Sequence, residues 1–390
     1  MNKKQTPNYT FALIIVIAVC FLIGFVTTMN NSMIEFCKEA FKLSDAQGQL
    51  VNTAFYGAYA LSIPFGFMMS KIGYKKTLIL GLAVVGIGFI INWAAISSNL
   101  DASTAVVYAY FLGSMFVVAL GIVMLQLVAN PYVMVLGAPE KGAFRMTLSQ
   151  ALNSVATTLA PIFIGSVIIA GQIPTPAAVP APYLGLGIFT LLLCVILVFL
   201  KLPEIKEEEQ AAEATGVVKE YKSSVFKYPH VWLGALAIFM YMGLEIGIPS
   251  MLPAYFKADP TLPGKATDYL WMYWGGMMVG RFIGAAVLSK FQPRVILTFC
   301  LAGGALCVGI SFMLNGMASV YCMLAAGLFH SVMWPLVFNL GVVGAATLTP
   351  LMGLVVDNPS LGVGYAIAMM FIYYIYVLWF CWKGSKVGLK

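Results

Sequence analysis

SKIGYK, residues 70–75, closes a long apolar run, and SKFQPR, residues 289–294, closes another about half a chain later. Both segments open with Ser-Lys and carry a second basic residue five positions after the serine. Such a recurrence is typical of membrane proteins built from two parallel repeats, related by an axis along the membrane normal. The two segments therefore predict a chain of two similar halves.

The composition excludes one large soluble domain. Of the 390 residues, 61% are hydrophobic and 9% are charged, whereas soluble domains carry about 25% charged residues. Apolar runs of roughly 17–25 residues cross a bilayer as helices, so an all-α membrane protein is expected. The twelve predicted transmembrane helices are residues 11–35, 48–69, 77–97, 104–136, 146–171, 183–202, 229–255, 268–289, 295–315, 318–339, 342–357 and 362–382.

The sequence lacks the motifs of common enzymes. The seven cysteines are scattered without paired spacing, which predicts neither a disulfide framework nor a metal site. No Ser/His/Asp set and no phosphate-binding loop stands out. We therefore expect no cofactor, no metal and no enzymatic activity.

The distribution of basic residues predicts the orientation. With the N-terminus in the cytoplasm, Lys38, Lys42, Lys257 and Lys265 lie outside, against the other 18 of 22 basic residues at inner ends or loops. Cytoplasmic loops of membrane proteins carry an excess of Lys and Arg, so both termini are predicted to be cytoplasmic. The net charge of +7 then requires no nucleic acid as a partner.

Two bundles are predicted on either side of a charged segment. Residues 203–228 hold 10 of the chain's 37 charged residues and are expected to form a cytoplasmic linker between six-helix bundles at residues 1–202 and 229–390. The tenth span runs into the eleventh at residues 339–342. Either this hairpin is unusually tight or residues are missing from this region.

Polar side chains recur on the predicted spans of both halves. Residues three or four apart share a helix face, as do Gln126 with Asn130 and Gln150 with Asn153. Amides that bind hydroxyls, with Trp and Tyr rings that stack on C–H surfaces, suit a neutral sugar. The alternative for each residue is a hydrogen bond between packed helices, worth about 0.6 kcal/mol. The candidate substrate-binding residues are Asn30, Asn31, Tyr56, Gln126, Asn130, Gln150, Asn153, Trp274, His330 and Trp334.

Two titratable residues lie well inside predicted spans. Glu245 is the carboxylate there and His330 the histidine. Intramembrane acids are by default functional, and histidine titrates near neutral pH, so both are candidate cation-coupling residues. The alternatives are a buried, hydrogen-bonded acid at Glu245 and a wall residue of fixed protonation at His330. Arg281, near the inner end of its span, is expected to snorkel or to pin an inner gate rather than bind substrate.

Several segments together resemble the fucose–galactose–glucose permeases, a branch of the major facilitator superfamily. The resemblance implies the major facilitator fold, twelve helices in two bundles, rocker-switch alternating access and hexose uptake coupled to a proton or sodium ion. A monomer in a bacterial inner membrane, surrounded by lipid, is expected. The segments are AFYGAYALSIPFGFMMSKIGYKK (54–76), LQLVANPYVMVLGAPE (125–140), FRMTLSQALNS (144–154), FKYPHVWLG (226–234), YWGGMMVGRFIG (273–284) and FHSVMWPLVF (329–338).

The chain departs from the resembled family at two positions. Proton-coupled fucose permeases carry an Asp and a Glu where this sequence has Asn31 and Gln126, while a glutamine before Ala-Asn-Pro is similar to the glucose/galactose members. Coupling would then fall to Glu245 and His330, or to a sodium ion bound by Glu245 and backbone carbonyls. The alternatives are an uncoupled uniporter, a carrier of another polar solute such as an amino sugar, and a non-transporting sensor.

Overall fold

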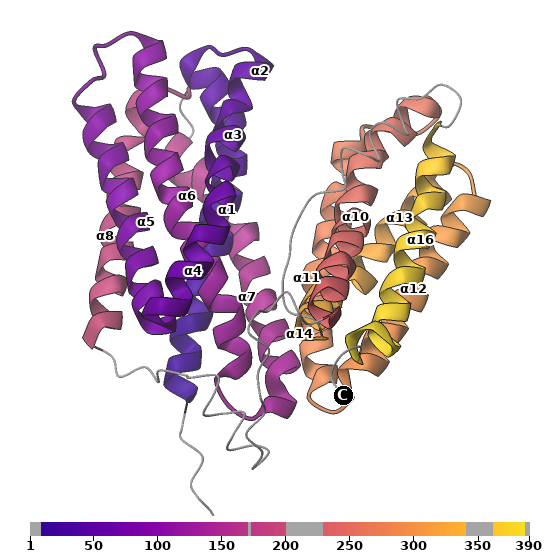
Figure 1. The fold of residues 1–390 in the computed structure, drawn as a ribbon. Helices are drawn as coiled ribbons and strands as arrows, with labels where there is room; N and C mark the ends of the chain where they lie inside the picture. Colours follow the sequence, from indigo (N-terminus) through magenta and orange to yellow (C-terminus); the bar gives the residue numbers. More distant parts are fainter. Residues whose placement is uncertain (1–8, 171–172, 200–228, 341–361, 387–390) are drawn as a thin grey trace, which may run out of the picture. The chain divides into compact units, whose positions relative to one another are not determined.

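The computed structural model describes residues 9–170, 173–199, 229–340 and 362–386 (Figure 1). Within these ranges every regular element is a helix. Contacts group the chain into two compact units, Met1–Pro139 with Leu152–Val218 and Glu140–Ala151 with Lys219–Lys390. The predicted linker, residues 203–228, and the predicted eleventh span, residues 342–357, lie outside the described residues.

The first half of the chain folds into long helices with short connections. α5 packs against α6 and α8, and α6 also packs against α1 and α3. This packing gathers the polar faces of α1, α3 and α6 within one unit. The bounds are α1 Thr10–Phe41, α2 Asp45–Gly48, α3 Leu50–Gly57, η1 Ala58–Leu61, α4 Ser62–Ile72, α5 Tyr74–Ser97, α6 Thr104–Val135, η2 Pro139–Lys141, α7 Gly142–Phe163, η3 Ile164–Ile169, η4 Pro176–Ala178 and α8 Pro180–Phe199.

The second half of the chain is built in the same way. α13 packs against α11 and α12, and α10 packs against α16 and α14. The bounds are α10 Pro229–Ala258, η6 Ala266–Asp268, α11 Leu270–Leu288, α12 Pro293–Met313, α13 Gly316–His330, α14 Met333–Leu340, α16 Gly362–Trp382 and η7 Gly384–Lys386.

The two basic segments both connect a helix to its successor. In the first, Gly73 joins α4 to α5 with a φ of 84°, a backbone conformation that glycine adopts without steric cost. In the second, Gln292 is extended and Pro293 opens α12, where its missing N–H is of no consequence. The recurring sequence pattern therefore marks corresponding short links in the two halves.

The span predicted over residues 48–69 is not one continuous α-helix. α3 ends at Gly57, a 3₁₀ turn follows as η1, and α4 begins at Ser62. Pro64 explains the break, because proline has no N–H and its ring would crowd the carbonyl of Ala60 in a regular helix. The tighter turn accommodates both effects.

The span predicted over residues 318–339 also divides, into α13 and α14. Pro335 lies four positions after Ser331, so it cannot donate the helical hydrogen bond that the Ser331 carbonyl would accept. The break leaves that carbonyl available to a side chain of another helix. This local effect of proline sets up the polar cluster described below.

Glycines bring α11 and α13 into close contact. A Cβ at Gly280 would lie 2.5 Å from the Leu328 carbonyl oxygen, and one at Gly327 would lie 2.5 Å from the Tyr273 carbonyl oxygen. A Cβ at Gly284 would overlap Val332. Gly280 and Gly284 thus permit close helix packing.

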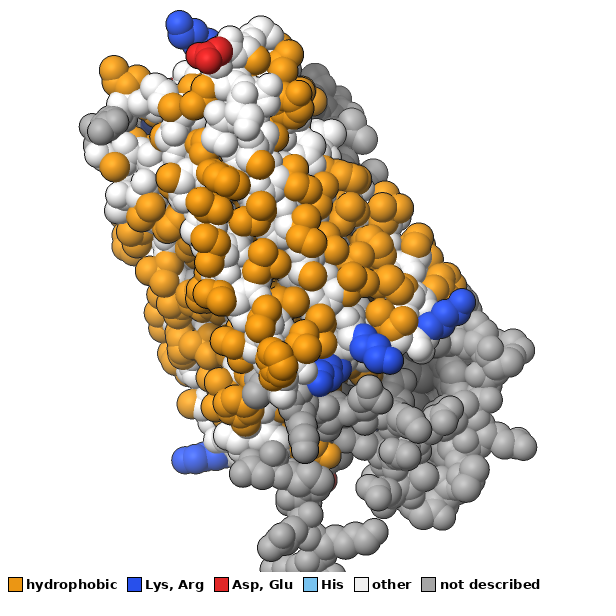
Figure 2. Space-filling model, turned by 90° about the vertical axis from the view of Figure 1, so that its left-hand side faces the viewer, with side chains coloured by type: hydrophobic (Ala, Val, Ile, Leu, Met, Phe, Trp, Pro, Cys, Tyr) orange, Lys and Arg blue, Asp and Glu red, His pale blue; other side chains and the backbone are white. Residues whose placement is uncertain are grey.

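Apolar surface covers helices that are long enough to cross a bilayer. In the part of the chain that the structure describes, eight helices qualify by length and composition. Figure 2 shows the face that carries α8, where hydrophobic side chains predominate and Lys and Arg lie toward its ends. Such a face suits contact with lipid. The exposed apolar residues of α8 include Ile188, Phe189, Leu192, Val195, Ile196 and Phe199.

Candidate functional site

Asn30 and Asn31 fasten α1 to α3 through two amide contacts. Asn30 Nδ2 donates to Asn52 Oδ1 at 3.3 Å, and the Tyr56 hydroxyl donates to Asn31 Oδ1 at 3.1 Å. Asn52 and Tyr56 are four residues apart, so they share the face of α3 that meets α1. Each of two adjacent amides in an apolar helix finds one partner in this way on the same face of α3.

The two asparagines differ in exposure. Asn30 is fully buried, whereas Asn31 is exposed and the Tyr56 side chain is 42% exposed. Asn31 and Tyr56 are therefore accessible to a polar ligand in this conformation. Asn30 lies within the packing between helices, and its Oδ1 has no hydrogen-bond partner among the described residues.

Gln126 on α6 joins this stripe. The Tyr59 hydroxyl lies next to the Gln126 side chain, and Tyr59 packs 5.7 Å from Tyr56, centroid to centroid. Asn130, one turn after Gln126, is half-buried and immediately precedes Pro131 within α6. The stripe thus combines amides with two aromatic rings.

The two predicted residues on α7, Asn153 and Gln150, have different surroundings. Asn153 Nδ2 donates to the Cys20 carbonyl of α1 at 2.7 Å. Gly24 makes this contact possible, because a Cβ there would lie 2.7 Å from Asn153 Cγ. Asn153 thus acts as a link between helices in this conformation. Gln150 is half-buried one turn earlier, in the part of α7 that groups with the second unit.

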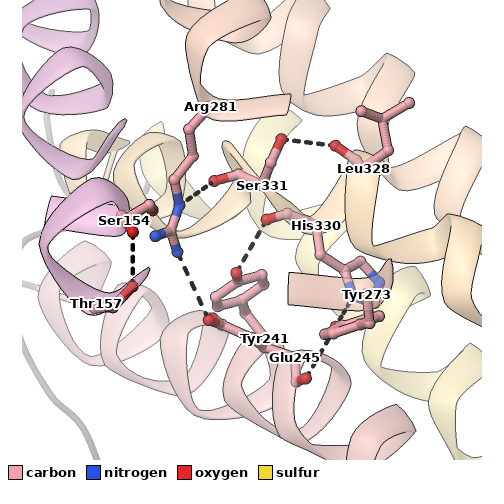
Figure 3. Close-up of polar contacts among 9 residues, drawn as sticks. All are labelled: Ser154, Thr157, Tyr241, Glu245, Tyr273, Arg281, Leu328, His330 and Ser331. Atoms are coloured by element: carbon pink, nitrogen blue, oxygen red, sulfur yellow. Dashed lines mark hydrogen bonds and ion pairs between the residues drawn. The ribbon is translucent and has the colours of Figure 1, made fainter. Parts of the chain in front are cut away.

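Glu245 and Arg281 form an ion pair in the second unit (Figure 3). Glu245 Oε1 lies 3.8 Å from Arg281 Nη2, and these side chains are 13% and 14% exposed. Arg281 Nε donates to the carbonyl of Ser331 at 3.2 Å, the group released by the break before Pro335. Arg281 therefore turns inward rather than snorkelling. With little water around it, such a pair attracts more strongly than an exposed one.

His330 is fully buried and hydrogen-bonded at both ring nitrogens. Nδ1 lies 2.7 Å from the Tyr273 hydroxyl, and Nε2 contacts the Tyr374 hydroxyl. The main-chain carbonyl of His330 accepts from the Tyr241 hydroxyl at 3.0 Å. His330 therefore ties α13 to α10, α11 and α16, and it offers no free surface to a ligand in this conformation.

The two predicted tryptophans are more accessible than His330. Trp274 is 45% exposed, and Trp334 is half-buried and stacks on Phe338 with ring centroids 5.1 Å apart. Both can present an aromatic face to a ligand. Among the described residues, no three His, Cys, Asp or Glu side chains come together as a metal site would require.

The structure adds residues that sequence reasoning missed. Tyr273, Tyr374 and Ser331 complete the polar cluster around Glu245 and His330. A tyrosine in an apolar span predicts such a contact, because its hydroxyl requires a hydrogen-bond partner when it is buried. The spacing of residues along one helix does not identify the partner on another helix.

The profile of the Major Facilitator Superfamily matches residues 16–380. The chain belongs to the major facilitator superfamily. The glucose/galactose transporter of Brucella abortus biovar 1 (strain 9-941) is 35% identical over 415 residues, covering 99% of this chain and 97% of that protein. The L-fucose-proton symporter of Escherichia coli (strain K12) is 27% identical over 401 residues, covering 91% of this chain and 89% of that protein.

A solved structure supports the same fold. The crystal structure of the major facilitator transporter FucP, in the outward conformation, matches with a TM-score of 0.76 at 23% identity, covering 96% of this chain and 99% of that chain. At this identity the match shows the fold alone. The predicted all-helical major facilitator fold and the resemblance to glucose/galactose and fucose relatives are confirmed.

Proposed function

We propose that this chain is a secondary active transporter that imports a hexose by alternating access, as a cation symporter. The observation that carries the proposal is the 35% identity to a glucose/galactose transporter across 99% of the chain. The fucose-proton relative supports a sugar substrate and proton coupling. Family membership supports a transporter rather than an enzyme.

The sugar is bound by the amides and aromatic rings of both halves. Asn31, Tyr56 and Gln126 provide hydrogen-bonding groups from three helical segments, and Trp274 and Trp334 provide stacking faces. Neutral sugars need many weak polar contacts and no strong charge, which matches this set. Asn130 and Gln150 extend it, while Asn30 and Asn153 hold its helices together.

Coupling depends on Glu245. A proton on its carboxylate removes the negative charge that pairs with Arg281 at 3.8 Å, and a sodium ion competes with Arg281 for the same oxygens. Either cation therefore changes the connection between α10 and α11. A change at this pair, made when the cation binds, is a physical means of biasing one conformation over another.

The proposed topology has twelve transmembrane helices with cytoplasmic termini. Residues 1–202 and 229–390 form the two six-helix bundles, and residues 203–228 form a cytoplasmic linker. The protein works as a monomer in lipid of a bacterial cytoplasmic membrane. Bacterial relatives and the distribution of Lys and Arg support this topology.

Uptake into proteoliposomes tests the function. Labelled galactose, glucose and fucose are supplied with an inward proton gradient, an inward sodium gradient, or neither. If uptake under one ion gradient exceeds uptake without a gradient, the protein is a symporter for that ion. Equal uptake in all three conditions identifies a uniporter, which the uncharged Asn31 and Gln126 favour. No uptake of any of the three sugars overturns the hexose assignment, and an amino sugar is then supplied.

A sensor is the competing function. The alignment with the Brucella protein spans 415 positions against 390 residues in this chain. At least 25 aligned positions therefore face gaps here, and the relative has residues that this chain lacks. Purified protein that binds sugar in detergent yet moves none across a bilayer would identify a sensor.

A further inference from the structure

His330 occupies a position that the proposed coupling step does not use. Its side chain is fully buried, and both ring nitrogens meet tyrosine hydroxyls that come from different helices, Tyr273 of α11 and Tyr374 of α16. Figure 3 shows Tyr273 between the ring of His330 and the backbone of Glu245. The directions of these hydrogen bonds determine where the protons lie.

The Tyr273 hydroxyl is the group that fixes the directions. It lies 2.9 Å from the main-chain carbonyl of Glu245, which can only accept a hydrogen bond. A tyrosine hydroxyl has a single hydrogen, so Tyr273 donates that hydrogen to the carbonyl. Its oxygen then accepts from the other neighbour, Nδ1 of His330, which must carry a hydrogen.

The hydrogen on Nδ1 determines the state of the second ring nitrogen, Nε2. A neutral imidazole with hydrogen on Nδ1 has a lone pair on Nε2, and the Tyr374 hydroxyl donates to it. One neutral tautomer therefore satisfies the whole chain of hydrogen bonds, from Tyr374 through His330 and Tyr273 to the carbonyl of Glu245.

A second proton on His330 would disturb this arrangement. It would turn Tyr374 from donor to acceptor, and it would place a positive charge on a ring that is fully buried. A buried charge is costly unless an opposite charge pairs with it. The titratable and charged side chains around the ring are Tyr241 and Glu245 of α10, Tyr273 and Arg281 of α11, Cys307 of α12 beside Tyr374, and Tyr374 of α16.

We propose that His330 is a positioning residue for Glu245, held neutral with its hydrogen on Nδ1, and that it does not carry a coupled proton. It acts on α10 at two places one helical turn apart. Its main-chain carbonyl accepts from Tyr241, and its Nδ1–H reaches the Glu245 carbonyl through Tyr273. These contacts fix the position of α10 along its axis and its rotation about that axis, so that the Glu245 carboxylate faces Arg281. This inference rests on the proposed role of Glu245 in coupling.

Nitrogen NMR of the full chain in lipid bilayers tests the tautomer. The sequence has two histidines, His230 and His330, so a His230→Gln variant with ¹⁵N-labelled histidine gives signals from His330 alone. We expect one bonded hydrogen, on Nδ1, that is unchanged between about pH 5 and pH 8. A hydrogen on Nε2 instead, or a titration within that range, overturns the proposal.

Substitution separates positioning from proton transfer. An asparagine can place an amide N–H near the position of Nδ1 but cannot carry a proton. In proteoliposomes, His330→Asn is expected to keep gradient-driven accumulation within about threefold of the wild-type ratio, and His330→Ala to lose about tenfold or more. Equal loss in both variants, in protein that is folded and exchanges sugar, would assign His330 to proton transfer.

The pH profile of accumulation tests the contact from His330 to Glu245 through Tyr273. Tyr273→Phe removes the hydroxyl between His330 and Glu245, and it is expected to shift the pH profile of accumulation because Glu245 is displaced from Arg281. Tyr376→Phe on α16 removes a hydroxyl that bonds the Leu233 carbonyl outside this chain of contacts, so its profile should match the wild type. An unshifted profile for Tyr273→Phe contradicts the proposal. Absence of transport in the wild type would instead refute the proposed function, while the tautomer measurement stands independently.

Discussion

Asn30 and Asn31 show how one helix can use adjacent amides for different purposes. The buried Asn30 bonds Asn52, and the exposed Asn31 is bonded by Tyr56. Neighbouring residues on a helix point about 100° apart, so one faces the packed interior and the other does not. The cost of placing amides in an apolar segment is offset in part, because each finds one partner on α3 while Asn30 Oδ1 has none among the described residues.

Gln126 is expected to contribute directly to sugar affinity. Gln126→Ala should weaken binding by about 1–3 kcal/mol, because it removes one partner and leaves polar groups of the sugar unpaired. Titration calorimetry with the transported sugar measures the change. Asn92→Ala is the control, since Asn92 is a buried amide that bonds Ser114 away from the stripe. Unchanged affinity in Gln126→Ala would place Gln126 among the helix-packing amides.

Glu245→Gln is expected to abolish accumulation against a sugar gradient while sparing exchange. The amide keeps the shape of the side chain but carries no charge to take up a cation. Counterflow and gradient-driven uptake in the same proteoliposomes distinguish the two activities. Glu35→Gln is the control, because the Glu35 side chain is 77% exposed and pairs with Lys38 on the surface. Full accumulation in Glu245→Gln would exclude Glu245 from coupling.

The ion pair between Glu245 and Arg281 should also contribute to the free energy of unfolding. Each single variant, Glu245→Gln or Arg281→Gln, leaves one charge with little water and without the opposite charge of this pair, whereas the double variant removes both charges. The double-mutant cycle should give a coupling energy of about 0.5–3 kcal/mol, measured from thermal unfolding of detergent-purified protein. Purely additive effects would show that the 3.8 Å contact contributes nothing to the folded state.

At the scale of elements, the close contact between α11 and α13 depends on Gly280. Gly280→Ala should destabilise the protein by about 1–3 kcal/mol, because the added carbon meets the Leu328 carbonyl and overpacks the contact between α11 and α13. Gly275→Ala on the same helix is the control, since its nearest neighbour would be 4.0 Å away. There the loss of backbone freedom in the unfolded chain should stabilise by about 0.4–1 kcal/mol. Melting temperatures that move together would contradict this view of α11.

The sequence predicts where helices run better than how they pair. Hydropathy locates α6 and α8 to within a few residues because long apolar runs have few alternatives in a bilayer. Breaks near Pro64 and Pro335 were not predicted, although the prolines themselves were visible. The contacts of Tyr273 and Tyr374 could not be predicted, because they depend on the rotation of each helix about its axis and not on local spacing.

For the whole molecule, composition and motifs predict the correct superfamily, because few folds are compatible with so apolar a chain that consists of two similar halves. The candidate site is less determined by sequence. Hydrogen-bonding side chains in a span can serve a ligand or a neighbouring helix, and the same residue types do both. Asn153, bonded to the Cys20 carbonyl, and Asn31, exposed beside Tyr56, have the same chemistry and different surroundings.

Orientation in the membrane gives a prediction for the chain as a whole. Ser70 and Ser98 are exposed residues on either side of α5, and the positive-inside rule places Ser70 in the cytoplasm and Ser98 outside. A membrane-impermeant maleimide should label Ser98→Cys in intact cells and Ser70→Cys only after permeabilisation, above the background of the seven native cysteines. The reverse pattern would invert the topology and place the basic SKIGYK link outside. Labelling of both from one side would mean that α5, despite its apolar length, does not cross the bilayer.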